Sequence, residues 1–511
     1  MALRTGGFPA TLASSDGFAV VAELVPWRDS ADSDRGALAL AIGDALAGHP
    51  RITALSITDG AGGHPAVAPL MVAQRYADRA REVIVHVACR DRSRRALQEL
   101  GWTLVNQGLT NVLALSGDSP AERAGGLSRP VFDLDSTGLL SMYAGLDPTR
   151  SFFLGAVVNS HKRHERELLP QYHKLELKIR SGARFIVSQL GYDARKSDEL
   201  IRYMRHRGLT TPVLANVFIL SDTVARRFHA GRVPGCVVTD DLLALVERRA
   251  AAPDRGRAFF LTLAAQQIAI ARGLGYRGVW ISGHRTAAEV TMVLELADRF
   301  GPDDWRGFAG AIRFGWPDGF YYFELDPATG LNRDTVNPAY LASCTIAARR
   351  SARGTVSSGY RCSRLLHALV FAPEAPGFPL GAAVYRGAEG TGLDRPLHLL
   401  EQAIKGPWFD CRDCGDCSLA ELAYLCPASH CPKGQRNGPC GGSRDGQCEV
   451  GDRACIWARA YERLKPYGEE ADILSRPLTI ADPALLHTSA WANTFLRRDH
   501  LARLTPRERT P

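Results

Sequence analysis

The chain has 511 residues, of which 45% are hydrophobic and 23% are charged, a composition that excludes a disordered or fibrous protein. A chain of this length is too long to fold around one hydrophobic core, so we expect two or three domains. The net charge of +8 forms no long block of like charge, which argues against a nucleic-acid-binding arm. No apolar run approaches the roughly 20 residues that span a bilayer, and the N-terminus lacks a signal-peptide core, so we predict a cytoplasmic protein without a membrane partner.

Short apolar runs that end on polar or small residues recur between Phe18 and Ser282. They are Phe18–Pro26, Ile52–Thr58, Glu82–Ala88, Asn111–Leu115, Phe152–Val158, Phe185–Gln189, Pro212–Asn216 and Gly278–Ser282. Helix-length segments separate most of them, as in βα units rather than hairpins. Because these alternations recur without a G-x-G-x-x-G after the first run, they favour a (β/α)₈ TIM barrel over an open doubly wound sheet.

The intervening helices and the domain boundaries follow from the same pattern. Helices are expected at Gly36–Leu46, Ser93–Leu100 (ended by Gly101), Gln171–Ser181, Asp193–His206 and Phe259–Arg272. Trp305–Thr355 is rich in Gly, Pro and aromatic residues without clean periodicity, which predicts an irregular stretch, and Leu397–Lys405 predicts a short helix. We therefore expect a barrel over residues 1–300, a connecting region over 301–395 and a small cysteine-rich domain over 396–511.

Eight of the twelve cysteines are concentrated in one short stretch. They are Cys411, Cys414, Cys417, Cys426, Cys431, Cys440, Cys448 and Cys455. In a cytoplasmic chain such a cluster indicates metal rather than disulfides, and soft thiolates select zinc or iron–sulfur clusters. The C-x₂-C-x₂-C spacing is similar to ferredoxin-type ligation of a [4Fe–4S] cluster, whereas two Cys₄ zinc sites would hold a small domain together. Eight ligands would fill two sites of either kind.

Polar residues at the ends of the predicted strands are the candidates for chemistry, because active sites of (β/α)₈ barrels lie at the carboxyl ends of the strands. Glu23 is the one acidic residue of the first strand, and Asp118 follows the fourth in Ser-Gly-Asp-Ser-Pro. Thr58 precedes a glycine-rich loop, and His86 lies near the end of the third strand. Each also has a plain structural explanation: a rim glutamate bonded to an amide, a turn-forming aspartate or a satisfied core histidine.

Five segments together resemble a known enzyme family. AELVP, SITDGAGG, HVACRD, ALSGDSP and KIRSGARFIVSQLGYD are similar, in this order, to the signatures of methylenetetrahydrofolate reductase, a flavin-dependent barrel enzyme. The stretch beginning CGDCSLAELAYLCPASHCPKG resembles the C-terminal domain of the same family. The resemblance implies reduction of 5,10-methylenetetrahydrofolate to 5-methyltetrahydrofolate with FAD. It implies a general acid at Glu23, an acid between flavin and pterin at Asp118, and a pterin-binding amide at Gln189.

The resemblance also implies that Thr58, His86, Asp118 and Lys178 contact FAD. The sequence departs from the family pattern at three places: Ser116 replaces a common Arg, Gln171 replaces an Asp, and Val158 or Asn159 falls where a Tyr is common. The segment Phe218–Asp222 offers no clear match for the aromatic residue that stacks on nicotinamide. The electron donor is therefore open between NAD(P)H and a protein, and so is assembly into a homo-oligomer.

Two other functions compete with the reductase. The first is a folate- or corrinoid-linked methyl-transfer protein with a structural zinc domain. The second is a zinc-stabilised nucleic-acid binder, which requires Lys and Arg runs interleaved with aromatic residues. Only Lys433, Arg436 and Arg444 lie in the heart of the cysteine cluster, so we rank this function last and expect no nucleic-acid partner.

Overall fold

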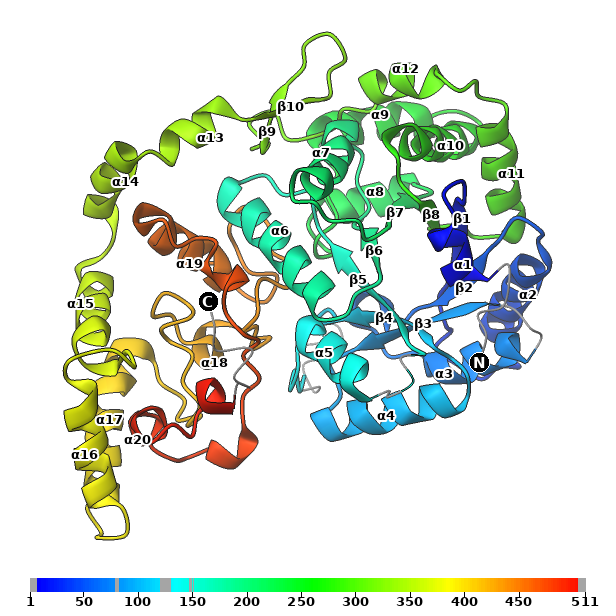
Figure 1. The fold of residues 1–511 in the computed structure, drawn as a ribbon. Helices are drawn as coiled ribbons and strands as arrows, with labels where there is room; N and C mark the ends of the chain where they lie inside the picture. The colour runs from blue at the N-terminus through cyan, green and yellow to red at the C-terminus, as the bar shows by residue number, and fades with distance from the viewer. Residues whose placement is uncertain (1–6, 79–81, 120–129, 147–148, 150, 504–511) are drawn as a thin grey trace. The chain divides into compact units, whose positions relative to one another are not determined.

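The computed structural model describes residues 7–78, 82–119, 130–146, 149 and 151–503, and the chain divides into two compact units (Figure 1). The first unit comprises Met1–Pro338 with Gly441–Asp445, and the second comprises Ala339–Cys440 with Gly446–Pro511. The division differs from the three expected parts, because residues 301–338 belong to the first unit and 339–395 to the second.

The first unit contains a closed barrel of eight parallel strands that neighbour one another in chain order (Figure 1). The strands are β1 (Ala19–Leu24), β2 (Ala54–Ile57), β3 (Val83–Ala88), β4 (Asn111–Leu115), β5 (Phe153–Val158), β6 (Phe185–Ser188), β7 (Val213–Phe218) and β8 (Gly278–Ser282). The barrel closes where β8 pairs with β1, with Trp280 opposite Val21. The predicted (β/α)₈ fold is therefore confirmed.

Helices connect the strands and cover the barrel. They are α2 (Asp34–Gly48), α3 (Pro69–Ala77), α4 (Arg94–Asn106), α5 (Ser136–Leu146), α6 (Glu165–Arg180), α7 (Ala194–His206), α8 (Asp222–His229), α9 (Asp240–Ala250), α10 (Arg257–Leu274) and α11 (Ala287–Asp298). The prediction that Gly101 ends its helix is wrong, since α4 continues to Asn106. A Cβ on Gly101 would lie 2.9 Å from the ring of Tyr143, so this glycine allows α4 to pack closely on α5.

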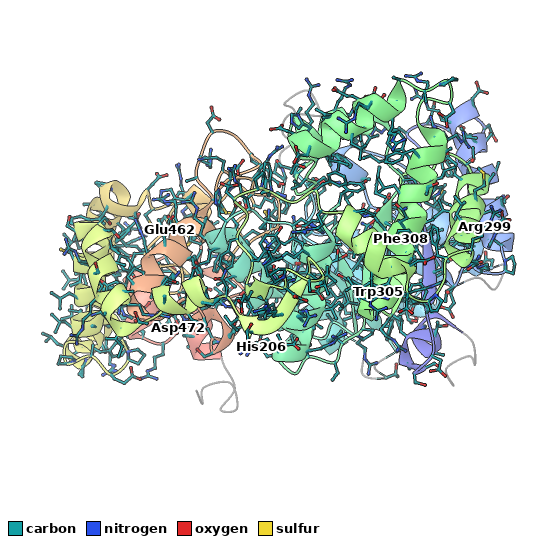
Figure 2. All side chains as sticks on the ribbon, turned by 90° about the horizontal axis from the view of Figure 1, so that it is seen from above. His206, Arg299, Trp305, Phe308, Glu462 and Asp472 are labelled. Carbon is teal, nitrogen blue, oxygen red and sulfur yellow. The ribbon has the colours of Figure 1, made fainter. Side chains whose placement is uncertain are left out.

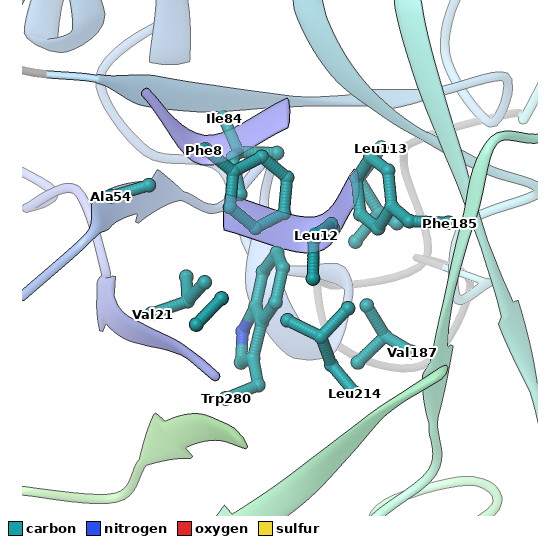
Figure 3. Close-up of a cluster of buried hydrophobic side chains, with 11 residues drawn as sticks. Phe8, Leu12, Val21, Ala54, Ile84, Leu113, Phe185, Val187, Leu214 and Trp280 are labelled. Carbon is teal, nitrogen blue, oxygen red and sulfur yellow. The ribbon is translucent and has the colours of Figure 1, made fainter. Parts of the chain in front are cut away.

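The barrel core is built from the inward-facing residues of alternate strand positions (Figure 3). The short helix α1 (Phe8–Ala13) closes the end at which the strands begin. Its Phe8 ring packs edge-on against Phe153 at 5.8 Å and Phe185 at 5.1 Å, and both are first residues of their strands. A packed core at the amino ends leaves the carboxyl ends as the place for a site.

Residues beyond the barrel are more ordered than the sequence indicates. Trp305–Thr355 holds α12 (Asp304–Ala311), β9 (Phe323–Leu325), β10 (Asn332–Val336), α13 (Pro338–Ser343) and α14 (Ile346–Ala352), so the prediction of an irregular stretch is wrong. The elements are short, and α13 and α14 bury no residue, so no long apolar period marks them. Helix α12 joins the barrel layer through Trp305, whose ring lies 2.2 Å from where a Cβ on Gly273 would be (Figure 2).

The second unit is helical around its cysteine-rich loops. Its further helices are α15 (Ser358–Leu366), α16 (Phe378–Ala388), α17 (Asp394–Phe409), α18 (Pro427–His430), α19 (Ile456–Leu464) and α20 (Ala490–Phe495). The helix predicted at Leu397–Lys405 is the middle of α17. Within the described residues, no helix has the length and hydrophobicity needed to cross a membrane. None of the twelve cysteines forms a disulfide bond.

Candidate functional site

A layer of polar side chains lies directly above the barrel core, at the carboxyl ends of the strands. Its members are Glu23, Ser56, His86, Gln189, Asn216 and Ser282. Each stands two positions after a residue of the core cluster, namely Val21, Ala54, Ile84, Val187, Leu214 and Trp280. Because strand side chains alternate between faces, this spacing directs the polar layer into the barrel mouth.

Glu23 is the acid of this layer, and its surroundings favour the protonated form. Burial raises the pKa of its carboxyl group to about 7, while a hydrogen bond from Trp280 Nε1 to Glu23 Oε2, at 3.4 Å, acts in the opposite direction. A carboxyl group with a pKa near 7 holds a proton on about half of the molecules at neutral pH. It can therefore serve as a general acid there, which an ordinary surface glutamate cannot.

His86 is held as a neutral ring. Its Nε2 lies 2.7 Å from the hydroxyl of Ser56, and burial lowers the pKa of the imidazole to about 4 against the opposing effect of the Asp59 carboxylate. The ring centroid lies 5.7 Å from that of Trp280. At physiological pH this histidine can exchange hydrogen bonds with a bound group but brings no charge to it.

Thr58 has a buried hydroxyl that finds no hydrogen-bond partner in the described part of the chain. Buried polar groups are nearly always satisfied, so such an atom marks a position where a bound molecule would complete the bonding. The loop that follows adopts left-handed conformations at Gly60 and Gly62, and Asp59 anchors it by accepting a 2.9 Å hydrogen bond from the Ala88 amide. Thr58 therefore fits a cofactor-binding role.

Asp118 and Glu23 both act electrostatically on one buried thiol. The pKa of Cys236 is raised, first by burial and then by the Asp118 and Glu23 carboxylates. Gly117, with a φ of 88°, turns the chain after β4, and Pro120 of the same motif lies outside the described residues.

Gln189 lies at the mouth of the barrel, and its side-chain amide is hydrogen-bonded to the neighbouring backbone. Its Oε1 accepts a hydrogen bond from the Leu190 amide at 2.9 Å. Its Nε2 lies 3.2 Å from where a Cβ on Gly235 would be, and Gly235 has a left-handed φ of 76°. The amide oxygen is therefore held by its own backbone through one hydrogen bond, and a carboxamide oxygen can accept a second one.

Lys178 is buried, and its Nζ donates a 2.5 Å hydrogen bond to the carbonyl of Val157. One turn earlier, Lys174 forms a buried ion pair with Asp135 at 3.1 Å. This pair could not be predicted from the sequence, because a lysine in a helix is usually solvent-exposed. Helix α6 instead buries residues on most of its faces, so both lysines point inwards.

Two of the residues that depart from the family pattern, Ser116 and Asn159, form hydrogen bonds within the barrel unit. Ser116 accepts a hydrogen bond from the Ser136 amide at 3.2 Å, at the start of α5. Asn159 donates to the carbonyl groups of Gly235 (3.1 Å) and Gly441 (3.0 Å), all within the first unit. Gln171 is buried, and its Nε2 has no partner among the described residues. Gln171 thus offers a second unsatisfied polar atom to a bound molecule.

Sequence reasoning missed Ser56, Asn216, Ser282 and Trp280. Asn216 and Ser282 join neighbouring strands through a 2.9 Å hydrogen bond from Ser282 Oγ to Asn216 Oδ1. The alternation within each strand carried a signal, because Ser56, Asn216 and Ser282 each follow a residue of the core cluster by two positions.

Phe218, at the end of β7, packs edge-on against Phe228, with their ring centroids 5.3 Å apart.

Four cysteines of the second unit surround one small cavity: Cys411, Cys414, Cys417 and Cys426, here called the first cysteine group. Its sulfur atoms accept hydrogen bonds from the Asp413 amide to Cys411 (3.4 Å), from Arg436 to Cys414 (3.7 Å) and from Lys405 to Cys417 (3.7 Å). Hydrogen bonds of this kind support thiolate ligands and tune the metals they hold. The chemistry of these donors, four thiols with N–H groups directed at three of them, therefore suits a metal that favours sulfur ligands.

The remaining four, Cys431, Cys440, Cys448 and Cys455, form the second cysteine group. Burial, together with the Cys440 and Cys455 thiols, raises the pKa of Cys431 to about 12, and the Cys440 thiol acts on Cys448 in the same direction. Backbone amides donate to Cys431 (3.4 Å) and Cys448 (3.5 Å). Across the described residues, no three His, Cys, Asp or Glu side chains converge on one ion position.

Comparisons with known proteins support two family assignments. Residues 38–269 match the family model described as methylenetetrahydrofolate reductase, and residues 391–482 match the one described as methylene-tetrahydrofolate reductase C terminal. No curated protein sequence matches the chain.

Among solved structures, two similar chains are an uncharacterized protein from Clostridium thermocellum that binds two copies of 5-methyl-5,6,7,8-tetrahydrofolic acid, and 2,3-dimethylmalate lyase, a member of the PEP mutase/isocitrate lyase superfamily. The first is 13% identical with a TM-score of 0.41, covering 55% of this chain and 94% of its own. The second is 12% identical with a TM-score of 0.35, covering 58% of this chain and 86% of its own.

Proposed function

Because the chain belongs, through its barrel and its C-terminal domain, to the methylenetetrahydrofolate reductase family, we propose that it reduces 5,10-methylenetetrahydrofolate to 5-methyltetrahydrofolate. The observation that carries the proposal is Glu23, a carboxyl group with a pKa of about 7 at the mouth of the barrel. A bound FAD supplies the hydride for this reaction. The protein supplies the proton, the orientation of the two ligands and the exclusion of water.

Glu23 has the properties that the first step needs. The five-membered ring of the substrate opens when one of its nitrogen atoms is protonated, and the resulting iminium carbon accepts the hydride. We assign the proton donor to Glu23, because its carboxyl group is protonated on a large fraction of molecules at neutral pH. The Asp118 carboxylate, like that of Glu23, raises the pKa of buried Cys236, and we assign Asp118 to the space between the two ligands.

The flavin would be held by groups that lack partners within the protein. The Thr58 hydroxyl and Gln171 Nε2 are buried and unsatisfied among the described residues, and each fits a polar atom of the cofactor. His86 would face the cofactor as a neutral ring. Lys178 donates to the Val157 carbonyl, and we assign its positive charge to the phosphates of the cofactor.

Replacing Trp280 with Phe should raise the pKa of Glu23. The indole N–H donates to the carboxylate and stabilises the ionised form, so its loss favours the protonated acid. Folate reduction in the wild-type enzyme should fall as the pH rises through about 7, because the proton on Glu23 is then lost. In the variant this decline should move to higher pH, as a pH profile of kcat would show; a decline that stays in place or moves to lower pH contradicts the assignment.

Replacing Gln189 with Ala should weaken folate binding by about 5- to 150-fold and leave flavin affinity unchanged, since a lost amide removes directional hydrogen bonds worth about 1–3 kcal/mol. Equilibrium titrations of each ligand measure the two affinities separately. Gln107→Ala, at an exposed position after α4, is the matched control. Equal weakening of both ligands would make Gln189 a structural residue.

For the second unit we propose that the two cysteine groups hold metal and pass electrons to the flavin. The C-x₂-C-x₂-C spacing within the first group and the N–H donors to its sulfurs support iron–sulfur ligation. Anaerobic purification with an absorption spectrum and metal analysis tests both halves of the proposal. A flavin spectrum with iron and sulfide supports it, whereas a colourless zinc protein favours the methyl-transfer alternative.

A further inference from the structure

Five residues from the cysteine-rich part of the sequence, Gly441–Asp445, belong to the barrel unit. They follow Cys440 directly and precede Cys448, so by sequence they lie between members of the second cysteine group. Their hydrogen-bond partners include Asn159 and Lys162, in the connection that leaves the carboxyl end of β5. We call Gly441–Asp445 the inserted loop, because it brings residues from far along the chain to the side of the barrel where active sites lie.

Lys162 and Asn159 anchor the start of the inserted loop. Lys162 is buried, and its Nζ donates hydrogen bonds to the carbonyl groups of Gly441, at 2.7 Å, and Ser443. Asn159 Nδ2 donates to the same Gly441 carbonyl at 3.0 Å. A buried ammonium group needs acceptors for its N–H groups, and here the backbone of the loop supplies them. Lys162 therefore fixes the path of the loop.

Charged residues hold the far end of the inserted loop. Arg163 Nη1 forms an ion pair with Asp445 Oδ1 at 3.0 Å. Arg444 donates to the carbonyl of His229 at 2.9 Å, and its guanidinium group lies over the ring of Trp316, 5.5 Å from the centroid. All of these partners belong to the barrel unit, so the loop is bound to that unit at both of its ends.

The first residue of the inserted loop lies beside the amide that we assign to folate. Asn159 Nδ2, Gln189 Nε2 and the Gly441 carbonyl oxygen each lie 3.1–3.2 Å from the position that a Cβ on Gly235 would take. Asn159 Nδ2 also donates to the Gly235 carbonyl at 3.1 Å. Asn159 thus joins the two backbone segments next to the Gln189 amide, and this close packing restricts how that amide can turn.

We propose that the inserted loop completes the folate site of the barrel, with Lys162 as its anchor and Gln189 as the group that it positions. The inference rests on the proposed function, since it concerns the folate that the barrel reduces. Lys162 and Gly441 are positioning residues, because they act on folate through Asn159 and Gln189. The barrel sequence alone therefore lacks one part of its own site.

The first test is Lys162→Met, which keeps the length of the side chain and removes its hydrogen bonds to the loop. The flavin-loaded, full-length variant should bind 5-methyltetrahydrofolate about 10-fold more weakly, because the amide is displaced but not removed. Its kcat at saturating folate should stay within about twofold of wild type, since Gln189 donates neither proton nor hydride. Calorimetry measures the affinity, and turnover with a chemical reductant measures kcat.

The same substitution in the Gln189→Ala background tests the route of the effect. With the positioned amide already absent, Lys162→Met should weaken folate binding little further. Losses of folate affinity that add in full in the double variant would show that the loop does not act through Gln189, and would overturn the inference.

Gly441→Ala perturbs the inserted loop by a second route. Gly441 has a left-handed φ of 96°, which alanine adopts only with strain, while the added Cβ would make an ordinary 3.7 Å contact with Gln171. This variant should also weaken folate binding and keep its flavin. Gly451→Ala is the matched control: Gly451 has a φ of 70° in the same cysteine-rich stretch, lies outside the loop and has open space around its Cβ position. It should bind folate normally.

Normal folate affinity in both Lys162→Met and Gly441→Ala would overturn the inference. So would a loss confined to Lys162→Met, which would assign the effect to the charge of the lysine. Parallel losses of folate affinity, flavin affinity and melting temperature would make the loop a stabilising element only. Failure of the wild-type protein to bind or reduce the folate would refute the proposed function, whereas folate binding that is indifferent to the loop would refute this inference alone.

Discussion

Replacing Glu23 with Gln should lower the rate of folate reduction by about 100-fold or more while the flavin stays bound and reducible, the scale expected when a general acid is lost. The amide has the shape of the acid and can still accept the Trp280 hydrogen bond, so the fold is preserved. What the variant lacks is the proton that opens the folate ring. Rapid-mixing kinetics with reduced enzyme measures this step apart from flavin reduction.

The control for this variant is Glu82→Gln. Glu82 lies just before β3, at the amino end of the barrel, where it accepts a 2.7 Å hydrogen bond from Asn111. Its replacement removes a carboxylate from the same barrel without touching the mouth, so turnover should stay near the wild-type value. Unchanged folate turnover in Glu23→Gln would remove Glu23 from the mechanism.

Replacing Cys414 with Ser should abolish reduction of the enzyme by a one-electron protein donor, while chemically reduced flavin still supports folate turnover. Cys414 is the middle ligand of the C-x₂-C-x₂-C run, and a serine hydroxyl is a poor substitute for a thiolate. Iron and sulfide should fall by about four each per chain if the first group holds a [4Fe–4S] cluster. Metal analysis and the visible spectrum measure this loss.

Cys362→Ser is the matched control, because Cys362 is an exposed thiol of α15 outside both cysteine groups. It should retain full metal content and full reduction by the donor. Zinc without iron in anaerobically prepared wild-type protein would refute the electron-transfer role. The second unit would then be a zinc-stabilised domain whose loss spares the chemistry of the barrel.

The barrel could be predicted because each strand carries its own signal. Asn111–Leu115 and Gly278–Ser282 are apolar runs that end on polar residues, and their bounds agree with β4 and β8. Glu23 stood out as the one acid on its strand. Its partner Trp280 could not be predicted, because the two meet only where β8 closes the barrel against β1, 257 positions apart in the chain.

Other parts of the site depend on long-range packing in the same way. Cys236 comes from a loop after α8, and nothing local to it indicates that the Asp118 and Glu23 carboxylates raise its pKa. The spacing of the cysteines predicted two sites but not which thiol belongs to which. Cys426 and Cys431 are five positions apart, yet Cys426 lines the cavity of the first cysteine group, whereas the pKa of Cys431 is raised by Cys440 and Cys455.

Hydride transfer from bound flavin to methylenetetrahydrofolate is tested most directly by mixing anaerobic, chemically reduced enzyme with this substrate and following flavin absorbance and product in a single turnover. Flavin should be reoxidised as 5-methyltetrahydrofolate forms in equal amount, and the rate should decline as the pH rises through about 7. Flavin that stays reduced, or product formed without its reoxidation, would show that no such transfer takes place.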